Sequence, residues 1–152
     1  NTMRENSKIL YIKAAMTNAG RKSCEGIYRV IAINDHIYLH ELAKVIVTSF
    51  DLDFESTYGF FNVDTAGVET GTIFEGNAVA VPDGTSVGNI TTGSVFSEKN
   101  RTAAFLYGAN NEWRFSLELS KIIDGCDKIK LPAIVQSCGE VPPPFEDFIY
   151  HS

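Results

Sequence analysis

Long apolar runs, cysteines and histidines are scarce in this sequence of 152 residues. No run approaches the ~20 apolar residues that a transmembrane helix requires, so we expect no contact with a membrane. The three cysteines, Cys24, Cys126 and Cys138, are odd in number and form no CxxC pair. That usage suits a reducing compartment better than a disulfide framework. The first residues also lack the pattern of a signal peptide, and we therefore expect a cytoplasmic protein.

Basic residues are outnumbered, because 13 Lys and Arg stand against 19 Asp and Glu and give a net charge of -6. They are scattered singly along the chain. Nucleic-acid binders usually carry a basic footprint, since much of their affinity comes from neutralising phosphates. The composition therefore disfavours nucleic acid as the partner of this domain.

Motifs for cofactors and metals are missing as well. The glycines at 84, 88 and 93 match neither the GxGxxG pattern nor the phosphate-loop pattern. His36 and His40 are four residues apart, but no second pair with metal-ligand spacing accompanies them. Cys138 has no histidine nearby in the sequence that could act as its base. We therefore expect no catalytic residues, no metal and no cofactor.

The residues that are present predict one globular domain over 1–152, since 44% are apolar and 21% are charged. Alternating apolar residues predict a strand at 8–16, and a β-branched apolar run predicts an internal strand at 27–33. Residues 57–63 have the composition of a third strand. Turn-forming and charged residues between 17 and 26 predict a loop.

The periodicity changes after the second predicted strand. Apolar residues recur at helical spacing and predict an amphipathic helix at 38–50 that packs on one face of the sheet. These residues are Leu39, Leu42, Ala43, Ile46 and Phe50. Because Tyr38 is not a capping residue, we expect Asp35 to cap this helix.

Residues 64–93 hold six of the twelve glycines, with threonines between them. We expect a long β-like arm or irregular hairpin there, since loops of this length are uncommon unless they are functional. A short helical turn is expected at 94–100, with Ser94 as its cap.

The clearest pattern is a hairpin made by 102–107 and 113–119. In its second strand, Trp113 and three other apolar residues share one face, and polar residues occupy the other. Trp113 therefore either anchors the apolar face of the sheet or stacks on a ligand. For the second alternative, the candidate binding residues around the hairpin loop are Tyr107, Asn110, Asn111 and Trp113.

The end of the chain predicts an edge strand at 131–135, because Pro132 suits an edge better than a centre. Such an edge could pair between two copies and form a homodimer. Three prolines at 142–144 then predict an extended, proline-rich tail at 140–152.

Taken in order, four segments resemble the plasmid pRiA4b ORF-3-like protein family. They are ILYIKAAM, IYRVIAINDHIYLHELAKVIVTSF, FLYGANNEWRFSLELSKI and LPAIVQSCGEVPPP. The resemblance implies a compact α+β domain with a mostly antiparallel sheet, no known reaction, and an association with bacterial mobile elements. The chain departs from the family where members carry Asp-Phe-Gly-Asp before the tryptophan. It has Gly108 to Asn111 there, so a role that needs those acids is not expected.

We therefore expect a non-enzymatic interaction module in which Trp113 and the 64–93 arm flank a groove. Two alternatives remain. One is an enzyme whose site is assembled from distant residues, such as Cys138 with a histidine or Tyr107 with a carboxylate. The other is an accessory nucleic-acid protein of a mobile element.

Overall fold

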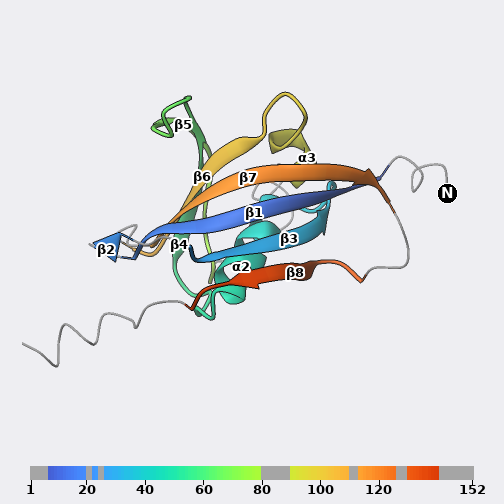
Figure 1. The fold of residues 1–152 in the computed structure, drawn as a ribbon. Helices are drawn as coiled ribbons and strands as arrows, with labels where there is room; N and C mark the ends of the chain where they lie inside the picture. The colour runs from blue at the N-terminus through green and yellow to red at the C-terminus, as the bar shows by residue number, and fades with distance from the viewer. Residues whose placement is uncertain are drawn as a thin grey trace, which may run out of the picture.

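A computed structural model describes residues 7–19, 22–23, 26–79, 90–109, 113–125 and 130–140. These residues form one twisted, antiparallel sheet with few helices, as expected for a mostly antiparallel α+β protein. Figure 1 shows β7, β1 and β3 running side by side, with helix α2 behind them. We call the side of the sheet that packs against α2 the helix face and the opposite side the outer face.

The sheet follows the order β5-β4-β6-β7-β1-β3-β8, and β2 pairs with β1 beside this path. The strands are β1 (Lys8–Ala19), β2 (Lys22–Ser23), β3 (Tyr28–Asn34), β4 (Thr57–Val63), β5 (Glu69–Asn77), β6 (Thr102–Tyr107), β7 (Trp113–Asp124) and β8 (Ala133–Cys138). Every pairing between them is antiparallel. The internal position of β3 and the edge position of β8 confirm two of the expectations from sequence, although β8 begins later than expected.

One local prediction was partly wrong, because the expected loop at 17–26 contains strand. β1 continues to Ala19, and β2 pairs with it through Asn18↔Ser23. On its other side, the same stretch of β1 pairs with β7 through Asn18↔Arg114. Backbone hydrogen bonding to neighbouring strands thus outweighed the turn-forming composition of this segment.

Helix α2 (Leu39–Ser49) buries five apolar residues against the sheet. Its N-cap residue is Tyr38, with no capping side chain, so the expectation that Asp35 caps the helix was wrong. A backbone group takes the place of a capping side chain, because the Leu39 amide donates to the Ile90 carbonyl at 2.9 Å. An unpaired amide at the helix start is thereby satisfied from a distant part of the chain.

Helix α3 (Thr92–Val95) begins earlier than the turn expected at 94–100. Its cap is Thr91 rather than Ser94, and the Thr91 hydroxyl accepts from the Ser94 amide at 3.3 Å. Thr92 is buried, and both its amide and its hydroxyl donate to the Ile37 carbonyl. These contacts fix α3 beside the start of α2. None of the helices in the described ranges is long and apolar enough to span a membrane.

The first part of the 64–93 arm is a hairpin of β4 and β5. Its turn is organised by Asp64, whose carboxylate accepts from the amides of Ala66 and Val68 at 2.8 and 3.0 Å. Gly67 has φ 84°, a left-handed conformation that glycine adopts without strain. Residues 80–89 of the arm, and the prolines at 142–144, lie outside the described residues.

The core lies between the helix face and α2. The ring of Phe50, which follows α2, packs on the sheet with its centroid 4.8 Å from that of Phe115. Within the sheet, the rings of Phe60 and Phe105 lie side by side on adjacent strands, with centroids 4.8 Å apart. Each fully buried ring contributes about 1.5–3 kcal/mol of transfer free energy. Trp113 is buried on the same face as Phe115. Of the two alternatives for Trp113, this is the one in which it anchors the apolar face of the sheet.

Candidate functional site

A groove crosses the outer face where one row of side chains is small. Register places Ala104 opposite Ser116, and Ser116 opposite Ala15, on three adjacent strands. The neighbouring positions on β7 are longer, namely Arg114 on one side and Glu118 on the other. Small residues between rows of larger ones leave a trough across the strands. The groove is lined in part by Ala104, Arg114, Ser116 and Glu118, and its volume is about 680 Å³.

The hairpin turn between β4 and β5 forms one wall of this groove. Asp64, Thr65 and Gly67 line it from the turn, and Glu69 lines it from the start of β5. The Asp64 carboxylate that accepts the two turn amides thus also shapes the groove. The Gly-rich arm therefore borders a groove through its first residues.

An ion pair ties this wall to the floor, because the Arg114 guanidinium contacts the Glu69 carboxylate. The Arg114 carbonyl also accepts from the Thr17 hydroxyl at 3.0 Å. With Asp64 and Glu118, the groove presents three carboxylates and one guanidinium. Since Glu69 neutralises the guanidinium, the lining retains acidic character.

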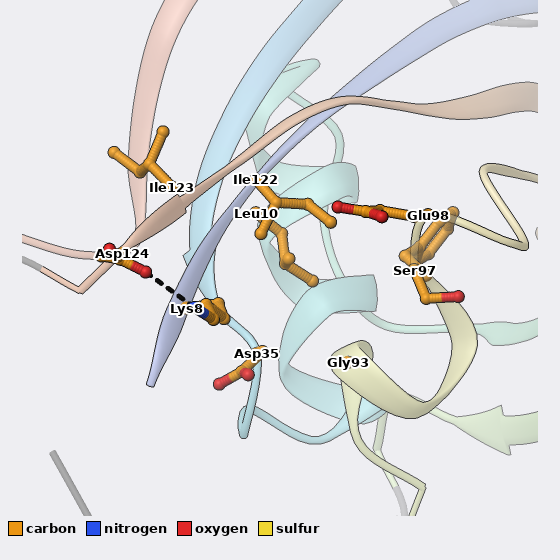
Figure 2. A pocket seen from close by; sticks show the side chains of 10 residues that line it. Lys8, Leu10, Asp35, Gly93, Ser97, Glu98, Ile122, Ile123 and Asp124 are labelled. Carbon is orange, nitrogen blue, oxygen red and sulfur yellow. Dashed lines mark hydrogen bonds and ion pairs between the residues drawn. The ribbon is translucent and has the colours of Figure 1, made fainter. Parts of the chain in front are cut away.

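A second, smaller pocket of about 370 Å³ lies beside α3, at the end of the sheet where β1 begins and β7 ends. Its inner surface is apolar, because Leu10 and Phe96 are almost fully buried. Figure 2 shows Leu10 and Ile122 on the side of the strands nearest Ser97. An apolar floor with a polar rim suits the side chain of an amphipathic ligand.

The rim of this pocket is electrostatically paired. Lys8 donates to Asp124 at 2.7 Å, the contact dashed in Figure 2. This hydrogen bond raises the pKa of Lys8 and lowers the pKa of Asp124. Both side chains are well exposed, so the pair fixes the ends of two strands without adding much stability.

On the helix face, His40 and Tyr58 form a polar contact within aromatic surroundings. His40 Nδ1 lies 2.7 Å from the Tyr58 hydroxyl oxygen. Burial raises the pKa of Tyr58 to about 12, so the phenol stays neutral. Gly76 makes room for this ring, because a Cβ there would lie 2.5 Å from the Tyr58 hydroxyl. The ring of Phe54 packs against both partners.

Of the binding residues suggested by sequence, Tyr107 and Trp113 do not line the outer-face groove. Tyr107 and Trp113 pair with each other across the hairpin, and both side chains are buried on the helix face. The Tyr107 hydroxyl donates to the Asp53 carbonyl and accepts from the Glu55 amide. Asn110 and Asn111 lie outside the described residues.

The groove had one signal in the sequence, namely the polar residues that alternate with the apolar ones in β7. Arg114, Ser116 and Glu118 occupy the outer positions of β7. The apolar positions of this strand form the core, whereas its polar positions line the groove. The contribution of the β4–β5 turn was not readable from sequence, because it depends on how two distant strands pair.

No group of three His, Cys, Asp or Glu side chains that could hold a metal occurs among the described residues. His36 Nδ1 lies 3.7 Å from the Asp35 carboxylate, whereas His40 contacts Tyr58. The two histidines therefore contact different residues. Cys138 is an exposed free thiol on β8.

The model of the plasmid pRiA4b ORF-3-like proteins matches residues 11–148, and the chain belongs to this family. A crystal structure described as the protein of unknown function MM3350 from Methanosarcina mazei Go1 is similar in fold. The two chains have a TM-score of 0.65 and 19% identity over 86% of this chain and 69% of the other. At that identity the likeness concerns the fold alone. A comparison with curated proteins found no significant match.

Proposed function

We propose that this chain is a non-enzymatic binding module, whose outer-face groove takes an extended, basic segment of a protein partner. The acidic lining of the groove is the observation that carries this proposal. Asp64, Glu69 and Glu118 stand there against one guanidinium, that of Arg114. Lysine or arginine side chains of a partner would meet a lining in which carboxylates outnumber guanidinium groups.

The surroundings of the groove support recognition rather than reaction. Asp64 is engaged by turn amides, Glu69 by Arg114, and Thr17 by a carbonyl. These internal contacts hold the lining in place before a partner arrives, which lowers the entropic cost of binding. The amphipathic helix α2 packs on the opposite face and stabilises the strands that form the floor of the groove. In its family context, we place such a partner among proteins of a mobile element.

Two observations favour an enzyme as the alternative function. The His40–Tyr58 contact joins two groups that serve in proton transfer elsewhere. In addition, residues 84–88 read Gly-Thr-Ser-Val-Gly, which matches the GxSxG pattern of nucleophilic serines. These five residues lie outside the described residues. The pattern counts as an elbow only between a strand and a helix.

A nucleic-acid alternative draws on two cation–π pairs of the outer face. Lys13 lies over the Tyr28 ring at 4.4 Å, and Lys121 lies over the Tyr11 ring at 4.6 Å. Basic and aromatic side chains together suit single-stranded nucleic acid. However, Glu118 lies opposite Lys13 in the strand register, and its carboxylate would repel a phosphate there.

A library of random extended peptides displayed on phage tests the proposal directly. We expect the wild-type protein to enrich sequences rich in Lys and Arg, and Ser116→Trp to lose them by filling the trough. Ser120→Trp is the matched control, because Ser120 is exposed on the same strand but does not line the groove. Failure to enrich basic peptides, or equal enrichment by Ser116→Trp, would contradict the proposal. Binding of single-stranded DNA that weakens steeply with salt would favour the nucleic-acid alternative instead.

A further inference from the structure

Strand β8 is an edge of the sheet that lacks the charged side chains which usually protect an edge. Within the described residues it pairs only with β3. Its six residues, Ala133–Cys138, contain no charge. Ile134 and Val135 are adjacent in the strand, where the register with β3 shifts, and they are 42% and 47% exposed. An uncharged edge with exposed apolar side chains readily pairs with another strand.

The opposite edge, β5, is built differently. It contains Glu69 and Glu75 as well as two glycines, Gly71 and Gly76. Its pairing with β4 is interrupted by two irregularities of register, whereas the pairing of β8 with β3 has one. Charges and glycines, which β5 has and β8 lacks, weaken the tendency of an edge to pair with another chain. The contrast singles out β8 as the edge suited to a partner strand.

The charges that flank β8 indicate which partner fits. Lys130 precedes the strand and Glu140 follows it, both exposed and at equal distances along the chain from Val135. We propose that β8 pairs antiparallel with β8 of a second copy, across a two-fold axis beside Val135. In that arrangement, Lys130 of each copy faces Glu140 of the other. A parallel pairing would instead place like charges together.

The edge is held firmly enough to act as a template. Arg29 is only 6% exposed, and its guanidinium donates to the carbonyls of Cys138 and Gly139 at 3.0 and 3.2 Å. It also donates to the Ser49 carbonyl, near the end of α2, at 2.8 Å. The end of β8 is therefore anchored to α2 through one buried side chain. A strand ordered beforehand loses less entropy when it pairs.

The contact is small, so the dimer should depend on concentration. Stable interfaces bury about 1,200–2,000 Å² in total, and one pair of short strands supplies less. The groove residues lie on other strands, so this inference stands apart from the proposed function. Cys138 does not face its own copy across an axis at Val135, so the dimer needs no disulfide.

Sedimentation equilibrium under reducing conditions, from about 1 μM to about 1 mM protein, tests this assembly. We expect the wild type to dimerise within this range. Lys130→Glu and Glu140→Lys should each weaken the dimer about tenfold, since each turns two attractive contacts into repulsive ones. The double variant should restore it. Glu140→Lys makes the chain less negative overall, so a general charge effect would strengthen association instead.

Val135→Lys places two like charges at the axis and should abolish the dimer. Thr72→Lys on β5 is the matched control, because Thr72 is an exposed residue of the other edge strand. Circular dichroism shows whether each variant is folded. A monomeric wild type at every concentration would overturn the inference. So would equal dissociation by both lysine variants, or a double variant no stronger than the single ones.

Discussion

The two faces of strand β7 differ in what they contribute to the molecule. Toward α2, the strand presents Trp113, Phe115, Leu117 and Leu119, all buried. Toward the outside, the same strand presents Arg114, Ser116 and Glu118, which are partly or fully exposed. The helix face thus supplies stability through packing, whereas the outer face supplies a polar groove whose residues can vary at little cost. The packed residues and the groove residues of β7 are separated by a single residue step along the chain.

The sharpest test of this contrast is a pair of neighbouring substitutions. Phe115→Ala removes a ring that contacts Phe50 and Phe105, and it should lower the free energy of unfolding by about 3–5 kcal/mol. Ser116→Ala, on the outer face, should change it by no more than about 0.5 kcal/mol. Urea denaturation followed by circular dichroism measures both values. A comparable loss in the two variants would show that the outer face is also a packed surface.

A second test adds atoms to the helix face. Gly76→Ala places a Cβ within 2.5 Å of the Tyr58 hydroxyl and 2.6 Å of its ring, so the ring must move. We expect a loss of about 1–3 kcal/mol in the free energy of unfolding, typical of overpacking. Gly71→Ala is the control on the same strand, because nothing lies within 4 Å of its added Cβ. If Gly76→Ala were tolerated as well as Gly71→Ala, the space around Tyr58 would be looser than the structure indicates.

The third test follows the ionisation of the buried Tyr58 phenol as the pH is raised. The pKa of Tyr58 is raised from 10.0 to about 12 in the folded protein. Its neutral form is therefore favoured by folding, and the stabilisation is fully present below pH 10. It is lost as the pH rises from 10.0 towards about 12. Tyr58→Phe should flatten this part of the pH profile of unfolding, measured by urea titration. An equally steep loss in Tyr58→Phe would assign it to other groups.

Much of the sheet was predictable from local pattern. The limits of β4 and β6 were predicted to the residue, and the alternation of β7 identified its buried face. These successes share a cause, because alternation along a strand records which side meets the core. The errors share another cause. The strand that replaced a loop after Met16, and the backbone contact that replaced a side-chain cap at Leu39, both depend on partners far away in sequence.

The candidate site was predictable only in outline. An arm beside a groove was expected, and the β4–β5 turn does line one. However, Tyr107 and Trp113 pack on the helix face, where their rings contribute to the core. An aromatic residue beside a turn has the same sequence pattern whether it faces a ligand or a core. Only the pairing register decides between them.

By itself, the sequence determined that this chain forms a mostly antiparallel sheet, because alternation and propensity act over a few residues at a time. It also determined the acidic character of the surface and the uncharged composition of β8. The tertiary structure decided that Ala104, Ser116 and Ala15 form one row, that Glu69 meets Arg114, and that β8 lies at an edge. Each of these depends on strands distant in sequence pairing in one register, which no local pattern specifies.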